Sequence, residues 1–326
     1  MKKEHFIIGI TLILVVAISL VSIFYPKTKL KEELTTIKVA EVTHSMFYTP
    51  LYVAIENGYF KEEGLNIELI LTSGANNVTA AVLSGDVQIG FCGPEASIYV
   101  YNEGVKDYIQ TFAGLTKRDG QFIVSRKKID NFQIQDLEGK EVLGGRAGGM
   151  PILNFIIAVK NNDLKNVKIN DSIDFPNLTS AFISGAGDFV NLYEPNATKL
   201  EKMGIGYVVA SIGSYSNEVP YTAFNAKKSF INNNPEIIKS FRKAINKAID
   251  YTQHNSAETI AKVIIKQFPD TALNDLITIV DRYKKADSWQ KDTFITEKAF
   301  NNLIEMMITG NFIKASVPYN KLIINE

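Results

Sequence analysis

The stretch from Thr36 to Ile70 constrains the fold most, because it predicts a strand, a helix and a second strand in direct succession. Residues 37–42 have the alternation of a strand, and Pro50 suits the first turn of a helix, where its missing N–H costs nothing. We expect Thr49 to cap this helix and Gly58 to end it. Such a unit normally makes parallel strands with a right-handed crossover. The sequence therefore predicts an α/β fold.

The loop from His44 to Tyr48 lies at the place where such folds bind ligands. In open α/β sheets, small ligands sit beyond the carboxyl ends of strands, beside helix N-termini. Ser45, Phe47 and Tyr48 are therefore candidate ligand-binding residues, and the two aromatic rings would form one wall of a mostly apolar pocket. The alternative is that these rings only cover the start of the helix.

Two later strand ends add candidates of the same kind. The residues that follow the second predicted strand and a third one at 87–91 share this position: Ser73, Gly74, Gly93, Pro94 and Glu95. Glycine allows a ligand to approach backbone N–H groups closely. The Glu95 carboxylate is a possible ligand contact, but it also stands where a helix dipole favours a negative charge.

A glycine-rich loop at 144–149 follows another short predicted strand and precedes a helix that begins near Pro151. Its backbone N–H groups and the positive end of the helix would suit an anion. The loop lacks the Gly-Lys-Ser/Thr ending of a nucleotide-hydrolysing loop. Gly148, Gly149 and Met150 are the candidates here, and an ordinary tight turn is the alternative.

Residues 181–190 repeat the pattern of residues 81–88: a helix end, a Ser-Gly turn, an aspartate and an apolar strand. The repeat is short, and chance similarity is the alternative explanation. We interpret it as a sign of two similar α/β lobes.

Composition excludes several classes of function. The chain has 326 residues, 35 Lys and Arg against 35 Asp and Glu, one cysteine and three histidines. A net charge of zero without a basic stripe argues against a nucleic-acid partner. A single cysteine excludes an internal disulfide, and so few cysteines and histidines argue against a structural zinc site. We expect no cofactor, and no spacing indicates a catalytic triad or a pair of catalytic carboxylates.

The N-terminus has a different character. Residues 6–25 are apolar without one charge, and Lys2 and Lys3 precede them. About 20 apolar residues can span a bilayer, whereas a secretory signal usually has only about 7–15. We predict an uncleaved signal-anchor in residues 1–26, followed by a charged tether at 27–36. A cleaved signal peptide is the alternative.

Three runs carry a resemblance to a known family: Pro50–Ala54, Asn57–Phe60 and Glu63–Leu65. Together they resemble the solute-binding proteins of ABC importers, in the branch that includes the nitrate, sulfonate and taurine binders and the thiamine-pyrimidine (NMT1/THI5-like) group. The resemblance implies a two-lobe periplasmic-binding-protein type II fold with a hinged cleft between the lobes. It also implies a monomer on the extracytoplasmic face, with a membrane permease as its partner.

The same resemblance suggests how the lobes divide the chain. We expect the first lobe at 37–120, the second at 121–212, and a return to the first lobe at 213–326, including the C-terminal helices. Asn191, Tyr193 and Glu194 resemble the family's acidic-Pro element at the cleft. Glu194 would accept hydrogen bonds from a ligand amine or pair across the cleft. Its alternative role is a helix-start carboxylate.

The sequence leaves more than one function open. A solute receptor is the first hypothesis, with a pyrimidine-like or other nitrogen-containing solute, or an alkanesulfonate, as its ligand. A thiamine-pyrimidine synthase is the second, but the histidine which those enzymes consume corresponds to Tyr48 here, and His44 lies earlier in the loop. A membrane-bound sensor is the third. No output domain follows the binding fold within the sequence, which weakens it.

Two remaining features have simple structural interpretations. Arg118-Asp119-Gly120 precedes the crossover to the second lobe, and we expect a local salt bridge in a turn there. Cys92 has no neighbouring His or Lys that would make a reactive thiolate, so we expect a small buried residue.

Overall fold

The computed structural model describes residues 33–72, 74–145 and 149–325. The chain divides into two units, Met1–Leu34 and Thr35–Glu326, and both sheets of the fold belong to the second unit. The predicted anchor and two candidate site residues, Ser73 and Gly148, lie outside the described residues. Within the described ranges, no helix is long and apolar enough to cross a membrane.

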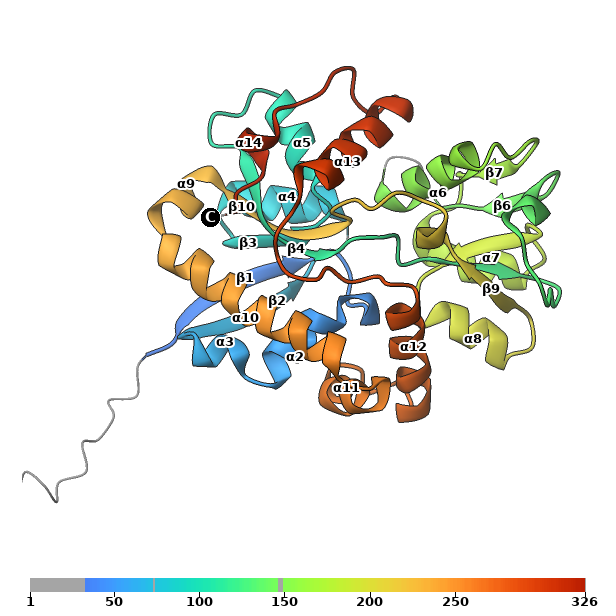
Figure 1. Cartoon of the computed structure of the whole chain (residues 1–326), viewed down its shortest axis with the longest axis horizontal. Coiled ribbons are helices and arrows are strands. Elements are labelled where there is room, and N and C mark those ends of the chain that lie inside the picture. The colour runs from blue at the N-terminus through green and yellow to red at the C-terminus, as the bar shows by residue number, and fades with distance from the viewer. Residues whose placement is uncertain (1–32, 73, 146–148, 326) are drawn as a thin grey trace, which may run out of the picture. The chain divides into compact units, whose positions relative to one another are not determined.

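The first five-stranded sheet has the order β2-β1-β3-β10-β4 (Figure 1). Its strands are β1 (Thr35–Glu41), β2 (Leu65–Leu71), β3 (Ile89–Cys92), β4 (Ile109–Thr116) and β10 (Thr222–Lys227). Strand β1 pairs in parallel with β2 and β3, whereas β10 runs antiparallel between β3 and β4. We call this sheet and the helices packed on it the first lobe.

The second sheet repeats this arrangement with the order β7-β6-β8-β5-β9. Its strands are β5 (Phe122–Ser125), β6 (Glu141–Leu143), β7 (Lys168–Asn170), β8 (Phe189–Leu192) and β9 (Tyr207–Ser211). Strand β6 is parallel to β7 and β8, and β5 is antiparallel to β8 and β9. The corresponding strands β3 and β8 each follow a helix and a glycine with positive φ, Gly85 at 89° and Gly185 at 103°. We call this sheet and its helices the second lobe.

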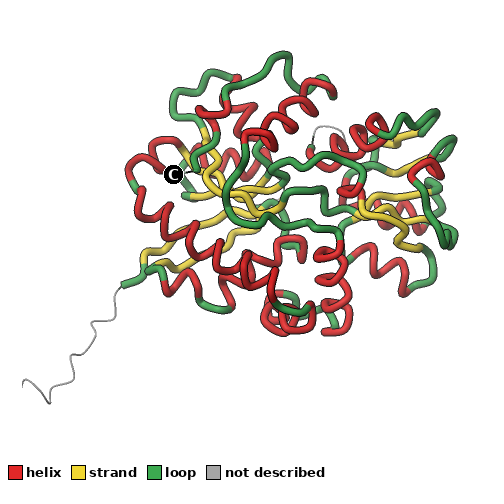
Figure 2. Tube along the Cα trace, in the orientation of Figure 1, coloured by secondary structure: helices red, strands yellow, loops and turns green. Residues whose placement is uncertain are grey.

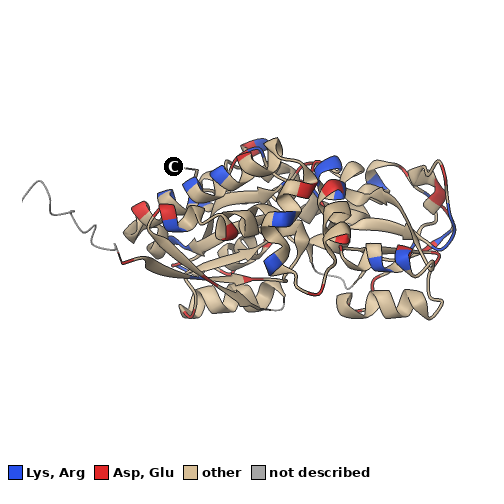
Figure 3. Cartoon of the chain, turned by 90° about the horizontal axis from the view of Figure 1, so that it is seen from below, with Lys and Arg blue, Asp and Glu red and all other residues tan. Residues whose placement is uncertain are grey.

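Helices flank both sheets (Figure 2). Those that precede the second lobe in the chain are α2 (Thr49–Glu56), α3 (Tyr59–Glu62), α4 (Ala75–Ser84) and α5 (Glu95–Asn102). The second lobe contains α6 (Met150–Asn161), α7 (Leu178–Ile183) and α8 (Asn196–Lys202). The C-terminal part contains α9 (Lys228–Asn233), α10 (Pro235–His254), α11 (Ala257–Ile264), α12 (Leu273–Lys285), α13 (Glu297–Thr309) and α14 (Tyr319–Leu322). Acidic and basic residues are interspersed on the face seen in Figure 3.

Some expectations about these elements are wrong in detail. Thr49 is the first residue of α2 rather than its cap, because its hydroxyl donates to the Met46 carbonyl over 2.6 Å. A 3₁₀ turn, η1 (Met46–Tyr48), fills the loop before it. Helix α13 contacts α6 of the second lobe as well as α14, which lies against β4 of the first sheet.

Aromatic packing joins the first sheet to the long helix α10. The Phe224 ring, which is fully buried on β10, stacks on Phe91 at 4.4 Å between centroids. It also meets Phe241 of α10 edge-on at 4.9 Å. Helix α10 buries one face through residues spaced three and four apart, as an amphipathic helix does.

We expect Phe224→Ala to lower the free energy of unfolding by about 3–5 kcal/mol, because it removes a large buried ring and leaves a cavity. The matched control is Phe294→Ala. That ring is 50% exposed, so its loss should change stability by no more than about 0.5 kcal/mol. Urea unfolding followed by circular dichroism would measure both values, and equal effects would contradict this view of the core.

Candidate functional site

Polar and aromatic side chains of both lobes meet where their strands end. Tyr48 follows β1, Glu95 follows β3 and Asp119 follows β4, while Asn191 and Tyr193 stand at the end of β8. Four of these residues are buried and Tyr193 is partly buried. The C-terminal edges of the two sheets thus face each other across one interlobe region.

Phe47 is the centre of the aromatic part of this region. Its ring centroid lies 5.8 Å from Tyr193 of the second lobe and 5.7 Å from Tyr221, which leads into β10. It also lies 5.3 Å from Tyr283 of α12. A Cβ atom at Gly120 would come within 2.5 Å of the Phe47 ring, so the connection between the lobes also packs directly on it. Phe47 is 1% exposed and thus covers more than a helix start.

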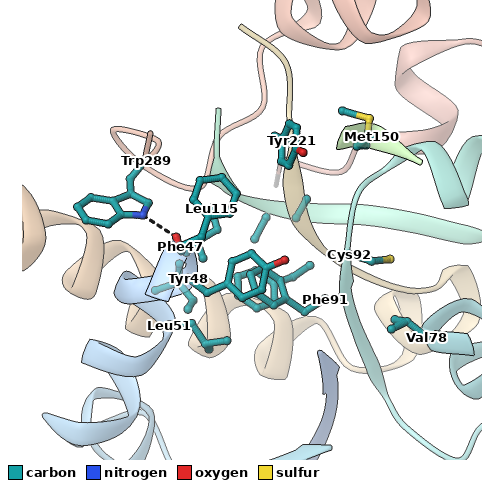
Figure 4. Packing of buried hydrophobic residues seen from close by; sticks show 14 of the residues in the cluster. Phe47, Tyr48, Leu51, Val78, Phe91, Cys92, Leu115, Met150, Tyr221 and Trp289 are labelled. Atoms are coloured by element: carbon teal, nitrogen blue, oxygen red, sulfur yellow. Dashed lines mark hydrogen bonds between the residues drawn. The ribbon is translucent and has the colours of Figure 1, made fainter. Parts of the chain in front are cut away.

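Two hydrogen bonds fix the position of this aromatic cluster. The Trp289 indole N–H donates to the Phe47 carbonyl over 2.8 Å (Figure 4). The hydroxyl groups of Tyr193 and Tyr221 are also hydrogen-bonded to each other, which joins the end of β8 to the start of β10. In Figure 4 the Tyr48 ring lies beside Phe91, with its hydroxyl on the side of Cys92. The ring centroids of Tyr48 and Phe91 are 4.5 Å apart.

Several buried side-chain atoms of this region have no hydrogen-bond partner among the described residues. They belong to Glu95 (Oε2), Asp119 (Oδ2), Gln121 (Oε1), Asn154 (Oδ1) and Asn191 (both amide atoms). Gln121 and Asn191 are neighbours, because the Gln121 amide donates to the Asn191 carbonyl over 3.4 Å. Asn154 lies in the second turn of α6 and donates to the Met150 carbonyl. Such atoms are rare in folded proteins, and each one calls for a ligand, a water molecule or a functional explanation.

The Glu95 carboxylate folds back over Gly93 at the start of α5. A Cβ atom at position 93 would lie 1.9 Å from Glu95 Oε2, so any other residue there would displace the Glu95 carboxylate. Burial raises the pKa of the Glu95 carboxyl to about 7, although a hydrogen bond to its own backbone N–H acts in the opposite direction. The carboxyl therefore exchanges a proton near neutral pH.

Asp119 is fully buried, and the salt bridge expected between Arg118 and Asp119 does not form. Asp119 Oδ1 instead accepts the Gln121 backbone N–H over 2.7 Å, and the Tyr221 hydroxyl also hydrogen-bonds the carboxyl. Burial raises the pKa of Asp119 to about 8 against these two hydrogen bonds, which lower it. The prediction was wrong because it assumed that neighbours in sequence pair, whereas the Arg118 side chain faces outward and the Asp119 side chain is buried.

Arg118 faces outward and belongs to an ion-pair network at the crossing between the lobes. Its guanidinium lies 2.8 Å from Glu218, and Lys117 lies 2.7 Å from Asp287. Lys117 is only 8% exposed. The Lys117 carbonyl also accepts the backbone N–H of Val219, so the two connections between the lobes lie side by side.

Glu194 is engaged by protein donors on both of its carboxylate oxygens. It accepts the Thr198 backbone N–H over 2.8 Å in the first turn of α8, and Arg282 of α12 donates to it over 2.7 Å. Arg282 also pairs with Glu201 of α8. Figure 1 shows α12 between α11 and α8. Glu194 therefore starts a helix and pairs across the lobes, the two roles that need no ligand.

The other candidates take less direct positions. Ser45 caps η1, because its hydroxyl accepts the Phe47 backbone N–H over 3.3 Å. Gly74 and Gly149 are the residues before α4 and α6, and Pro94 precedes α5. Met150 is the first residue of α6 and is 3% exposed. It lies near Tyr221 in Figure 4.

His44 lies apart from the unpartnered polar atoms. Its Nδ1 is 2.7 Å from Glu41 and its Nε2 is 2.9 Å from the Gln267 carbonyl. Its ring also packs against Tyr52 and Phe268. These contacts hold the loop against the C-terminal helices, and the hydrogen bond to Glu41 raises the pKa of His44.

The described surface also contains an open groove of about 630 Å³ beside α9, the start of α10 and Ile324. It is lined in part by Lys239, Arg242 and Lys243. None of the interlobe residues above lines it. Among the described residues, no group of three or more His, Cys, Asp or Glu side chains is placed to hold a metal ion.

Sequence reasoning missed Asp119, Gln121, Asn154 and Tyr221. Asp119 and Gln121 lie on the first connection between the lobes, and Tyr221 leads into β10. No Gly-rich loop or helix start marks a site at these positions. A weak signal did exist: Asp119 is an acidic residue directly before a segment that reads as a buried strand. Such a residue has to be paired, neutral or functional once the strand is buried.

The fold is that of the periplasmic binding proteins. The alkanesulfonate-binding protein SsuA from Xanthomonas axonopodis pv. citri, solved with bound MOPS, superposes with a TM-score of 0.68 at 12% identity, over 90% of this chain and 99% of that one. The sequence narrows this class further. The chain belongs to the NMT1/THI5-like family, whose model matches residues 46–259.

Two relatives in the sequence comparison agree with this family. YtlA of Bacillus subtilis, named as a candidate binding protein, is 41% identical over 91% of this chain and 90% of its own length. The formylaminopyrimidine-binding protein of Halalkalibacterium halodurans is 24% identical over 72% of this chain and 67% of its own length. The resemblance expected from the first 65 residues is thus confirmed.

We expect Arg282→Met to destabilise the chain by about 3 kcal/mol, because it leaves the buried Glu194 carboxylate without its charged partner. Lys285→Met is the matched control on the same helix. Lys285 is 77% exposed and pairs only with Asp281, so its loss should cost no more than about 0.5 kcal/mol. Denaturant unfolding would measure the free energy of unfolding of both variants. An unchanged value for Arg282→Met would show that the Arg282–Glu194 pair does not hold the lobes together.

The two buried carboxyls also predict how stability depends on pH. Their pKa values in the folded chain, about 7 and about 8, lie above the ordinary values of 4.5 and 3.8. Between these limits the folded chain binds more protons than the unfolded chain, so its stability falls as pH rises. Without ligand, the temperature of half-unfolding should therefore fall between pH 5 and pH 8. The double variant Glu95→Gln, Asp119→Asn should lose most of this dependence and keep the part that the raised pKa of His44 contributes. An unchanged slope would contradict the burial of these groups.

Proposed function

We propose that this chain is the extracytoplasmic solute-binding receptor of an ABC importer. It captures a small organic solute, pyrimidine-like or otherwise nitrogen-containing, between its two lobes and delivers it to a membrane permease. The observation that carries the proposal is the set of buried, unpartnered polar atoms from both lobes, which meets beside the aromatic cluster around Phe47. Binding sites for small molecules combine apolar and aromatic walls with a few polar groups in this way.

The proposed site draws its residues from both lobes. Tyr48, Glu95 and Asp119 come from the first lobe or the connection that leaves it, and Asn191 and Tyr193 come from the second lobe. A solute that contacts both sets favours the closed arrangement over an open one. The permease would then distinguish the loaded receptor by its closed lobes.

The remaining candidates have different weights in this proposal. Phe47 and Met150 would line the walls, and Gly93, Pro94 and Gly149 would shape the backbone around the solute. Glu194 is better assigned to the contact between α8 and α12, because protein donors already occupy it. Ser73 and Gly148 stay predictions from the sequence.

A receptor accounts for this geometry better than a synthase does. The synthases of the resembling branch consume a histidine at the position of Tyr48, and His44 is held by Glu41 and the Gln267 carbonyl instead. The named relatives above are described as binding proteins. We therefore propose a monomeric, non-enzymatic receptor whose N-terminal segment anchors it or directs its export.

The test is thermal unfolding of the full chain, kept in mild detergent, with pyrimidines, amines and alkanesulfonates. A ligand at a hundred times its dissociation constant should stabilise the folded chain by about 2.7 kcal/mol. Tyr48→Ala should remove most of this shift, whereas Cys92→Ser, a change at an equally buried neighbour, should leave it. Equal shifts in both variants would take the His44–Tyr48 loop out of the site. No shift with any small molecule would contradict the receptor.

A further inference from the structure

The two carboxyl groups of the interlobe region bear on the chemistry of the solute, which the proposed function leaves open. Glu95 is 6% exposed and Asp119 is 0% exposed, and each has one oxygen, Oε2 and Oδ2, without a hydrogen-bond partner in the described part of the chain. They stand on different elements, one in the first turn of α5 and one on the connection that leaves the first lobe. A buried acceptor left unsatisfied destabilises the fold, so two of them in one region favour a donor supplied by the solute.

On this basis, and resting on the proposed function, we propose that the receptor selects a solute with N–H donors: a protonated amine, an amidine or an amino-substituted heterocycle. The carboxyl oxygens of Glu95 and Asp119 accept those N–H groups. Sulfonates and nitrate, for which other proteins of this fold are named, offer these oxygens no N–H donor, so we expect the receptor to reject them.

Among the described residues, which leave out Arg146, the groups that face these two carboxyls bring no positive charge. Tyr48, Cys92 and Tyr99 lie near Glu95. The groups that face Asp119 from the surrounding elements are likewise phenols: Tyr193, Tyr221 and Tyr283. Burial raises the pKa of all of these groups, so they stay neutral at ordinary pH.

The cationic side chains that lie close to these carboxyls in the sequence or in the fold form ion pairs with other residues. Lys117 and Arg118 pair with Glu218 and Asp287 on the outer side of the crossing. Arg282 pairs with Glu194 and Glu201. No ion pair within residues 33–72, 74–145 and 149–325 involves Glu95 or Asp119. An anionic solute placed beside them would therefore meet two acidic groups with no compensating charge from these cations.

The protonation states of the carboxyls give the proposal an independent signature. With pKa values of about 7 and about 8, both groups carry protons for part of the time at neutral pH. A cation stabilises the ionised carboxylates, so its binding releases protons to the buffer. An anion would favour the protonated carboxyls and take protons up. The sign of the proton exchange thus separates the two classes of solute.

The experiment is titration calorimetry of the full chain at pH 7 in two buffers of different ionisation enthalpy. The probes with N–H donors are benzamidine, putrescine and formylaminopyrimidine, and the anionic probes are MOPS, methanesulfonate and nitrate. We expect binding only in the first group, with net proton release for the two permanently charged cations. Glu95→Gln and Asp119→Asn should each weaken binding about tenfold or more, because a hydrogen bond to a charged group contributes about 1.5–3 kcal/mol.

Asp130→Asn is the matched control. This carboxylate is 75% exposed and pairs only with Lys128, so its variant should bind like the original chain. Folding of the site variants is checked separately by their unfolding midpoints at pH 8, which should equal or exceed that of the original chain because a buried charge is removed.

If no probe binds, native mass spectrometry after incubation with the small-molecule fraction of a cell extract decides the matter. A recovered solute with N–H donors supports the proposal. A sulfonate, nitrate or another solute without such donors would overturn it and leave the receptor function standing. Recovery of no solute would contradict the receptor function itself, and the proposal with it.

Discussion

The removal of polar side chains from water between two lobes is the constraint on which the rest of this structure depends. A chain that buries Glu95, Asp119, Gln121 and Asn191, each with at least one side-chain atom that has no partner among the described residues, loses the hydration of those atoms, and this cost has to be offset elsewhere. The aromatic cluster around Phe47 supplies part of the offset, since it packs side chains of both lobes and the crossing against one ring. The Arg282–Glu194 pair adds a contact between α12 and α8.

The elements that local chemistry specifies were predictable from the sequence. Pro50 and Gly58 set the limits of α2, and the Ser-Gly-Asp echo indicated the strands that became β3 and β8. Both follow from backbone preferences that act within a few residues. The expectation for Thr49 failed because its hydroxyl bonds back to Met46 in a 3₁₀ turn, a choice that the surrounding packing makes rather than the residue type.

The candidate site was predictable only where it follows strand ends. Tyr48 and Glu95 became candidates because the position after a parallel strand has a known geometry, and Asn191 and Tyr193 because they resemble the family's acidic-Pro element. Asp119 and Tyr221 stand where the chain crosses between the lobes, and their proximity depends on how two connections far apart in sequence lie against each other. No spacing within the sequence encodes that contact, and the Arg118–Asp119 expectation failed for the same reason.

The balance between these terms explains how a ligand could control the lobes without changing the fold. Under the proposed function, the aromatic cluster and the Arg282 pair would favour closure, whereas the unpartnered carboxyls would oppose it, most strongly when they are ionised. A solute that satisfies the carboxyls removes the opposing term and leaves the favourable contacts in place. The solute can drive closure only by the difference between its binding free energies for the closed and the open arrangement. This difference limits how far the solute can shift the population toward the closed arrangement. Strengthening the contacts that favour closure without ligand would weaken the distinction between empty and loaded receptor, so a receptor of this kind gains by keeping its buried acceptors unpaired.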